Sequence, residues 1–394
     1  MARTSAPHRH RLRAPVIGTA ALLLILPTVA VADDGSARDI DQACLGSSST
    51  EQRFTDVTGG VHEPAINCIA AFYITVGSGA GDYDGSSPVT REQMATFLTR
   101  SLARMRPSVF TLPEIDHTDD GPFGDEVSGV HGTSVNQLYE LGIVAGQADG
   151  TYGATANVNR QQLATFVVRT IEEVTGEDLP QSASFADVSG THQDNVEKLA
   201  TIGVLQGTGP DTFEPHADVT RAQMATILAR ALDYLVEEGA MYGVDGYPRT
   251  PPDARFGLTD VGVTEQDDTD QVTLQVEGDD GHVGWSVRYV EEAVQDGSGN
   301  PVDVEGDAIL LVELIGSVPA GLGGLPPEIE DELFDFDEEA IEAEGDAIVD
   351  VVNGGIFEAR HRIFIGTTGT LPFTVEREAD PQVVTVEIEH PTDD

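Results

Sequence analysis

The sequence predicts a multidomain protein in which an all-α part is followed by an all-β antiparallel sandwich. A helix-forming segment occurs three times, as VTREQMATFLTRSL at 89–102, VNRQQLATFVVRTI at 158–171 and VTRAQMATILARAL at 219–232. Recurrence at this length is the mark of a repeat architecture. After about residue 256 the apolar residues alternate with polar ones, as they do in half-buried strands. Residues 239–255 lie between the two patterns and contain GVDGYPRTPPDAR, which predicts a linker.

The first 32 residues predict a secretory signal peptide. Four arginines precede an apolar run, and Ala30-Val31-Ala32 supplies an A-x-A cleavage site, so the mature protein is expected to begin near Asp33. The apolar run is too short and wrongly flanked for a spanning helix. A second apolar stretch of membrane length does not occur in the sequence. We therefore expect no membrane span after cleavage, and a protein that stays with the cell would be held non-covalently.

The two cysteines predict one disulfide. Cys44 and Cys68 are the only cysteines of this chain, and exported chains commonly form such bridges. The bond would tie the N-terminal tail, residues 33–53, to the first repeat. Cys68 stands where the other copies have Gln137 and Lys198, so it does not fill a core. A zinc or redox site, the alternative, lacks the further ligands it would need.

The chain is strongly acidic, with a formal net charge of −47. Removing the four leader arginines leaves 17 basic against 68 acidic residues, or −51. A field of this sign repels nucleic acid and anionic lipid, so both are poor partners, and we expect no nucleic acid to bind. The simplest interpretation is solubility, with a salty habitat as a hypothesis, because salt screening would still let local arginines hold an anion.

Each repeat is predicted to contain two helices, and the repeats span residues 54–106, 119–174 and 185–238. A first helix follows the motifs FTDVTGGVH, FGDEVSGVH and FADVSGTH. A glycine loop and an aromatic residue lead to the second helix, which begins with an N-cap residue and a glutamine three positions later, as a capping box requires. We interpret the motif histidines as capping or packing residues. The apolar positions of the first helices are Ile66, Ile69, Ile74; Val135, Leu138, Ile143; and Val196, Leu199, Val204.

An aspartate and an arginine recur as strictly as the core. The arginine stands at the first helical position, where unpaired backbone N–H groups and the helix dipole favour an anion. For a single copy, a surface cation beside a cap and a turn-forming or ion-paired aspartate would be the preferred interpretation. Three copies in register favour ligand contact. The pairs are Asp56 and Arg91, Asp125 and Arg160, and Asp187 and Arg221, separated by 35, 35 and 34 positions.

These motifs resemble S-layer homology repeats in the triplicate arrangement of that family. The resemblance implies a pseudo-threefold all-α bundle that anchors an exported protein non-covalently to pyruvylated secondary cell-wall polysaccharide. Residue by residue, it places the ligand-contacting arginines on Arg91, Arg160 and Arg221. The aspartates of the family fall on Asp56, Asp125 and Asp187, and two parallel hydrogen bonds from a guanidinium suit a pyruvate carboxylate. The family's usual glutamate is replaced by glutamine at Gln93, Gln162 and Gln223, and Asn159 stands for threonine.

The second half predicts a sandwich of about seven to nine short strands over residues 256–391. Alternating apolar residues such as Val272, Leu274 and Val276 define the strands, and DDG and DGSGN separate early ones. This half resembles the AMIN-like domains of actinobacterial exported proteins, most clearly at DGSGNPVDVEGDA. The resemblance implies envelope or glycan binding without catalysis. The acidic stretch 326–346 predicts a solvated helix or loop, since its spacing fits no calcium loop.

The sequence favours a non-catalytic protein without metal or cofactor. It contains no G-x-S-x-G elbow and no H-E-x-x-H motif, and carboxylate pairs are too abundant to indicate a glycosidase. The partner is expected to be a secondary cell-wall polysaccharide or peptidoglycan. One alternative is a structural surface-layer or adhesive coat protein that self-assembles through its β-domain. Another is a wall hydrolase with unrecognised carboxylates.

Overall fold

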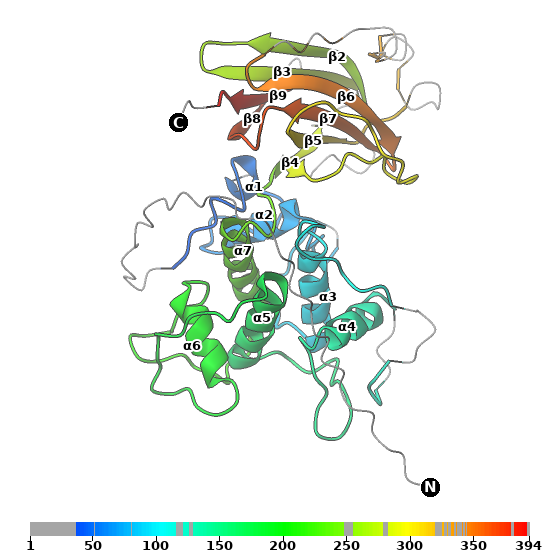
Figure 1. The fold of residues 1–394 in the computed structure, drawn as a ribbon. Coiled ribbons are helices and arrows are strands. Elements are labelled where there is room, and N and C mark those ends of the chain that lie inside the picture. Colours follow the sequence, from blue (N-terminus) through cyan, green and yellow to red (C-terminus); the bar gives the residue numbers. More distant parts are fainter. Residues whose placement is uncertain are drawn as a thin grey trace, which may run out of the picture. The chain divides into compact units, whose positions relative to one another are not determined.

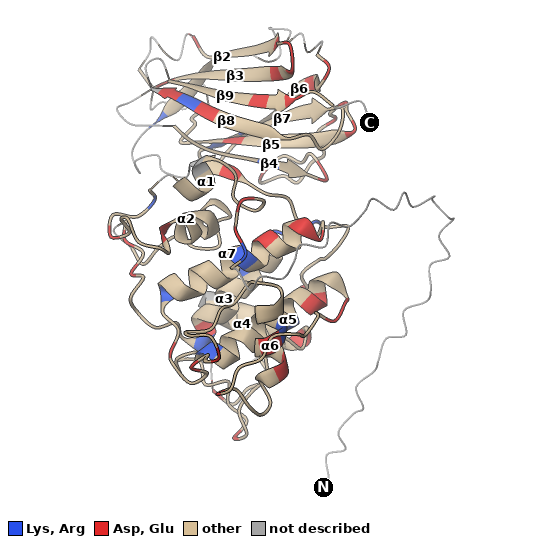
Figure 2. Cartoon of the chain, turned by 90° about the vertical axis from the view of Figure 1, so that its left-hand side faces the viewer, with Lys and Arg blue, Asp and Glu red and all other residues tan. Residues whose placement is uncertain are grey.

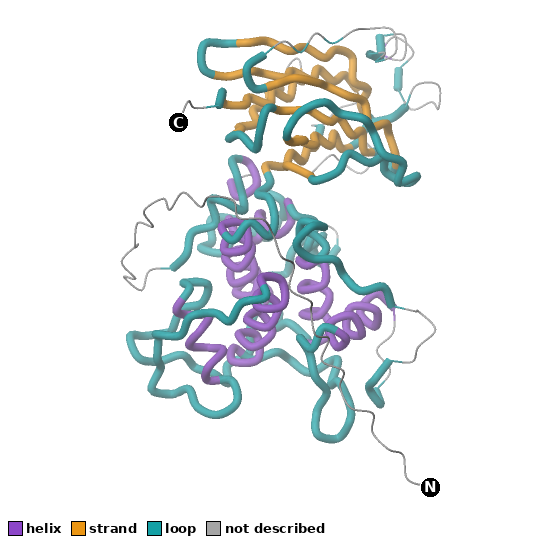
Figure 3. Tube along the Cα trace, in the orientation of Figure 1, coloured by secondary structure: helices purple, strands orange, loops and turns teal. Residues whose placement is uncertain are grey.

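Helices form the first half of the described chain and strands form the second (Figures 1 and 3). The computed structural model describes residues 37–391 except 51, 80, 116–120, 126–128, 248–254, 279–282, 320–324, 380–381 and parts of 327–344. The predicted signal peptide therefore lies outside the described residues. The helices are α1 Ser47–Thr50, α2 Glu63–Ala71, α3 Arg91–Leu102, α4 Gly129–Glu140, α5 Arg160–Thr175, α6 Gln193–Thr201 and α7 Arg221–Glu237. Below, the predicted repeats are called segments 1 (54–106), 2 (119–174) and 3 (185–238).

The three predicted capping boxes are confirmed. At the start of α3, the Thr90 hydroxyl accepts the Gln93 N–H, and the Gln93 side chain accepts the Thr90 N–H. Helices α5 and α7 begin in the same way, with Asn159 and Thr220 as N-caps. These caps fix where each helix starts. The predicted apolar positions of the first helices are all buried, at no more than 2% exposure.

Each first helix packs on the second helix of a different segment. Helix α2 packs on α7, α4 packs on α3, and α6 packs on α5 (Figure 1). The backbone closes the same cycle before the second helices. The Val89 N–H donates to Val219 (3.0 Å), the Val219 N–H to Val158 (3.0 Å), and the Val158 N–H to Val89 (2.9 Å). The three segments thus share one core, because no two-helix unit could bury its apolar faces alone.

The motif histidines link segments. His62 and His192 stand at the N-cap positions of α2 and α6, but neither side chain makes a capping hydrogen bond. Of the two predicted roles, these histidines therefore have the packing role. Their ring Nδ1 atoms lie 2.7 Å from threonine hydroxyls of a neighbouring segment, as does that of His131. The pairs are His62 with Thr226, His131 with Thr96, and His192 with Thr165.

The disulfide between Cys44 and Cys68 forms and fixes the N-terminal tail on α2. The Asp233 carboxylate on α7 strengthens this attachment, because it accepts the N–H groups of Gln42 (2.9 Å) and Ala43 (3.1 Å). Cys68 is fully buried beneath the tail. The expectation that Cys68 does not fill a core is therefore wrong, because it belongs to the buried core of the helical half, whereas Gln137 and Lys198 at the corresponding positions are half-buried.

The second half forms two antiparallel sheets, as predicted. One has the order β1-β4-β5-β7-β6 and the other β2-β3-β9-β8. The strands are β1 Asp245–Tyr247, β2 Phe256–Glu265, β3 Thr269–Gly278, β4 Gly284–Val290, β5 Ala308–Ile315, β6 Ile348–Phe357, β7 Arg360–Thr367, β8 Phe373–Ala379 and β9 Gln382–Glu389. Buried residues of both sheets, among them Leu274 and Trp285, form one core between them.

The described first part of the segment predicted as a linker packs with both halves of the chain. Met241 and Val244 are buried with the helices, and β1 follows at once and pairs with β4 of the larger sheet. Gly-rich composition predicts flexibility, but here the backbone hydrogen bonds of a sheet edge hold the chain. Gly35–Asp394 consequently forms one compact unit. Within the described residues, we find no helix with the length and apolar character of a membrane span.

Candidate ligand-binding groove

The helix starts that carry Arg91, Arg160 and Arg221 are closed by neighbouring loops. The N–H of Arg91 donates to Ala156 (3.0 Å) and that of Glu92 to Ala154 (3.0 Å). The corresponding N–H groups of α5 and α7 donate in the same way to loops of segments 3 and 1. With the third N–H taken by the cap, these helix ends are not free anion sites. The prediction of unpaired N–H groups at this position is therefore wrong.

The guanidinium groups also contact these loops. The Nε of Arg91 donates to the Tyr152 carbonyl (2.9 Å), that of Arg160 to Phe213 (2.8 Å), and that of Arg221 to Tyr83 (3.0 Å). Each guanidinium also lies over the ring of the same aromatic residue, with Cζ at 4.5 to 4.6 Å from the centroid. Arg91 and Arg221 are 8% exposed. These contacts join adjacent segments, and ligand contact by the arginines stays a prediction.

The aspartates fix the loops that receive the arginines. The Asp187 carboxylate accepts the N–H groups of Phe213 and Glu214, both at 2.8 Å. These hydrogen bonds lower the pKa of Asp187, that from Glu214 most. Asp56 likewise accepts the N–H groups of Tyr83 and Asp84, both at 2.7 Å. Asp125 makes the corresponding bonds to the N–H groups of Tyr152 and Gly153.

The structure thus pairs the six predicted residues differently from the pairs that their spacing in the sequence suggests. Aspartate and arginine of the same segment do not meet. Instead, an aspartate holds the aromatic loop of its own segment, and that loop accepts the arginine of another. The resulting chains are Asp56, Tyr83 and Arg221; Asp125, Tyr152 and Arg91; and Asp187, Phe213 and Arg160.

Arg221 differs from the other two in its terminal amino groups. The Nη2 of Arg91 donates to Ala145 (3.1 Å) and that of Arg160 to Gln206 (2.8 Å). Among the described contacts, the guanidinium of Arg221 donates through Nε alone. Its side chain lines a groove of about 460 Å³. Both terminal amino groups of Arg221 are therefore available to a ligand there.

The groove combines residues of all three segments. Arg221 comes from segment 3, His131 from segment 2, and the remainder from segment 1, including the 75–78 loop and the side chains of Gln93, Thr96 and Arg100 on α3. Two arginines in one groove stand out in a chain with 68 acidic and 21 basic residues, where red segments are more frequent than blue ones along the ribbon (Figure 2). Asp84 and Ser87 add acceptors that suit hydroxyl groups.

Arg100 was not predicted as a site residue. Its Nη1 donates to the Ile74 carbonyl (3.1 Å), as that of Arg169 does to Ile143 (3.2 Å). The signal was present in the sequence, since an arginine recurs nine positions after each helix-start arginine, at 100, 169 and 230. No role was predicted for these three arginines from the sequence. Its place in the groove follows from packing between segments, which a single repeat does not reveal.

Comparison with known proteins identifies both halves. Residues 126–164 and 184–225 match the model of the S-layer homology domain, and residues 257–390 match that of the AMIN-like domain. The chain carries both domains. The S-layer homology matches cover parts of segments 2 and 3, and segment 1 lies outside them.

Several cell-surface proteins are similar to parts of this chain. A cell surface protein of Thermoanaerobacter kivui is 29% identical over 32% of this chain and 16% of its own length. The middle cell wall protein of Brevibacillus brevis is 34% identical over 26% of this chain and 10% of its own length. An endoglucanase of Bacillus sp. (strain KSM-635) is 26% identical over 48% of this chain and 20% of its own length.

The chain thus spans a fifth or less of the length of these relatives. The S-layer homology domain and the surface-protein relatives identify a secreted protein associated with the cell wall. In the described part of the chain, no group of three or more His, Cys, Asp or Glu side chains is arranged to hold a metal ion.

Proposed function

We propose that this protein is a non-catalytic envelope protein whose helical half binds an anionic, pyruvylated secondary cell-wall polysaccharide. The groove lined by Arg221 and Arg100 carries this proposal. A ketal-linked pyruvate presents a carboxylate, and the free amino groups of Arg221 can donate to it in a fixed planar geometry. The AMIN-like half would act as a second envelope-binding module.

The helical half supports three S-layer homology repeats in a pseudo-threefold bundle. In the ring of hydrogen bonds among Val89, Val158 and Val219, segment 1 donates one bond and accepts one, as do the two matched segments. The arginine, aspartate and histidine contacts repeat around that ring. We therefore assign segment 1 to the same repeat family.

The three repeats differ as ligand sites under this proposal. In segments 1 and 2, Arg91 and Arg160 use two nitrogen positions each on loop carbonyls, which leaves less capacity for a ligand. Arg221 retains its full terminal pair. We infer that the groove at Arg221 binds the polymer most strongly. The aspartates contribute by holding the loops in place, in addition to any sugar contact.

Sedimentation with cell walls tests the proposal. The full secreted chain is mixed with native walls and with walls stripped of accessory polysaccharide by hydrofluoric acid. We expect pelleting with native walls alone. Arg221→Gln and Arg100→Gln should each abolish pelleting or weaken it by at least about tenfold, since each removes a hydrogen bond to a charged group. Equal pelleting with both wall preparations would refute polysaccharide anchoring.

Two substitutions serve as matched controls. Arg160→Gln removes the same loop hydrogen bond as Arg221→Gln, and Arg169→Gln removes the same carbonyl contact as Arg100→Gln, but neither residue lines this groove. Arg169→Gln should pellet like the unaltered chain, and Arg160→Gln, at a weaker site, should lose much less binding than Arg221→Gln. If all four variants lose binding together with helical circular dichroism, the arginines are structural alone. Ordered aggregates that grow with protein concentration would instead support the self-assembling coat.

A further inference from the structure

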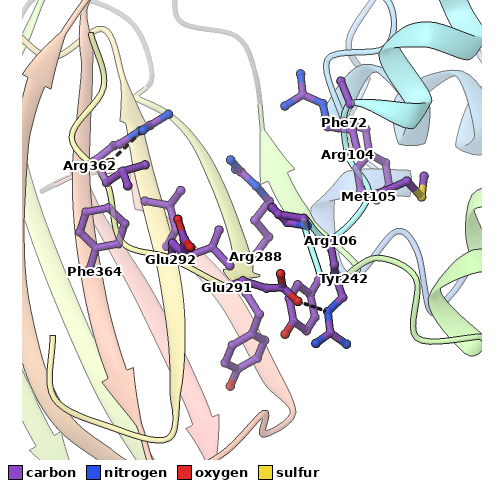
Figure 4. Close-up of a pocket in the computed structure, with 16 residues that line it drawn as sticks. Phe72, Arg104, Met105, Arg106, Tyr242, Arg288, Glu291, Glu292, Arg362 and Phe364 are labelled. Atoms are coloured by element: carbon purple, nitrogen blue, oxygen red, sulfur yellow. Dashed lines mark hydrogen bonds and ion pairs between the residues drawn. The ribbon is translucent and has the colours of Figure 1, made fainter. Parts of the chain in front are cut away.

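A second arginine-rich pocket lies where the end of α3 meets the larger sheet. It has a volume of about 380 Å³ and is lined by residues 103–107, by β4 and the turn after it, and by β5 and β7 (Figure 4). Phe72, Met105, Tyr242 and Phe364 give it apolar walls. The ion pair between Arg106 and Glu291 (2.8 Å) joins its two sides.

The sheet supplies two arginines that share one buried acid. Arg288 contacts the Glu313 carboxylate at 2.8 Å and Arg362 contacts it at 3.2 Å. The Glu313 side chain is 1% exposed, so this charge is almost fully withdrawn from water. Arg362 also pairs with Asp296 at 3.4 Å. These two guanidinium groups are thus compensated, although they share Glu313 between them.

Arg104 lines the pocket from the helical side and makes no ion pair among the described contacts, although the charge of Glu313 attracts it from a distance (Figure 4). Its Nε is buried without a hydrogen-bond partner among the described residues. Burial, and next the charge of Arg288, lower the pKa of Arg104 to about 10, so the group is still charged at neutral pH. The side chain as a whole is half-buried, but a buried donor without a hydrogen bond is costly, and an anion in the pocket would reduce that cost.

Tyr73 beside Arg104 adds an independent sign of function. Its backbone is in the left-handed region (φ 56°), where segments 2 and 3 have Gly142 (φ 72°) and Gly203 (φ 74°). A bulky residue is strained there, and such strain concentrates at functional sites. The Tyr73 ring lies 5.8 Å from the Cζ of Arg104 and 4.8 Å from that of Arg360. The ring thus holds two arginines beside the pocket, and its hydroxyl is buried without a described partner.

We propose that this pocket binds a small organic anion, with a carboxylate or phosphate held by Arg104 and Arg288 and a carbon skeleton packed on the apolar walls. The planar donors of guanidinium match both oxyanions. The exposed Glu292 at the same pocket would disfavour a ligand of high charge. The site is separate from the groove at Arg221, since the two share no lining residue.

Calorimetric titration of the full secreted chain tests this site. The probes are glucuronate, which carries a carboxylate, glucose 1-phosphate, and neutral glucose as the control, all at matched ionic strength. We expect saturable binding of one equivalent of at least one anion and none of glucose. The anion that binds identifies the ligand chemistry. Absence of binding by both anions at millimolar concentration overturns the proposal.

Variants connect the binding to the pocket. Arg104→Gln should weaken binding at least about tenfold, because it removes a charged donor. Lys198→Gln makes the same charge change on α6, outside the pocket, and should bind normally. If Arg104→Gln loses its native circular dichroism, anion binding is measured with Arg288→Lys instead. This variant keeps the charge but loses the planar pair of donors, so it should also bind the anion more weakly. Normal anion binding in a folded Arg104→Gln or in Arg288→Lys overturns the assignment. Wall pelleting should persist in both variants, which separates this proposal from polysaccharide anchoring.

Discussion

Acid should destabilise the β-domain through one buried histidine, His361 on β7. Burial lowers its pKa from the usual 6.5 to about 4, and the side chain is 6% exposed. Because the folded pKa lies below the unfolded one, the unfolded state binds more protons between these values. Stability is therefore full above pH 6.5 and falls as the pH decreases toward 4. The linkage relation gives a loss of about 2 kcal/mol between pH 7 and pH 5.

His361→Phe should remove this acid sensitivity. The imidazole Nε2 lies 2.9 Å from the Asn353 side-chain oxygen, which also accepts the Gly355 N–H at 2.8 Å, so Asn353 keeps a partner in the variant. We expect a cost of about 1 kcal/mol at pH 7 for the lost hydrogen bond. At pH 5 the variant should be at least as stable as the unaltered chain.

Urea unfolding followed by tryptophan fluorescence measures both effects. Trp285, the single tryptophan, is buried on β4 and pairs with Leu314 on β5, which in turn pairs with His361. Its emission therefore reports on the sheet that contains the histidine. His216→Gln, at an exposed position in the helical half, is the control and should leave the pH dependence unchanged. Equal losses between pH 7 and pH 5 in His361→Phe and the unaltered chain would refute the argument.

Three further predictions test other contacts. Replacing Cys44 and Cys68 by serine should reduce the stability of the helical half by about 3 kcal/mol, measured by urea unfolding without reductant, because the bond closes a loop of 24 positions. Asp187→Asn should flatten the acid transition of the helical half seen by circular dichroism, since the lowered Asp187 pKa gives stability that is present above pH 3.8 and is lost as the pH falls through the folded value. The hydrogen bond to Asp270 raises the pKa of His390, so protonated His390 stabilises the folded β-domain. This stabilisation is full below pH 6.5 and is lost as the pH rises through the pKa of the folded state. His390→Gln should remove that loss of stability in unfolding followed by fluorescence.

Local sequence signals predicted the elements well because their causes are local. The cap at Thr90 and its glutamine three positions later act within one helical turn, so the start of α3 could be read directly. The buried face of the first helices follows from apolar spacing in the same way. The position of β1 could not be predicted, because a three-residue strand in a Gly-rich stretch is stabilised by pairing with β4 and not by its own composition.

The candidate site was predicted less well because its contacts run between segments. Asp56 and Arg91 recur at a fixed spacing, and that spacing suggested a shared ligand. In the structure both positions help to join segments, since each aspartate fixes a loop and each arginine binds the loop of another segment. A residue that a repeat needs for assembly recurs as strictly as one needed for binding. Periodicity therefore cannot separate the two roles.

The differences between copies are more informative about function than their agreement. Arg91 and Arg160 place a second guanidinium nitrogen on a loop carbonyl, whereas Arg221 leaves its terminal pair open in a groove. Tyr73 likewise departs from the glycines that follow the other first helices, and it lies beside Arg104, whose buried Nε has no hydrogen-bond partner among the described residues. Assembly constrains what all three segments share, because each must close the same cycle. A position that differs in one segment is not needed to close that cycle, so it can serve ligand binding. Substitutions at Arg221 and Tyr73 should therefore be tested first for loss of ligand binding.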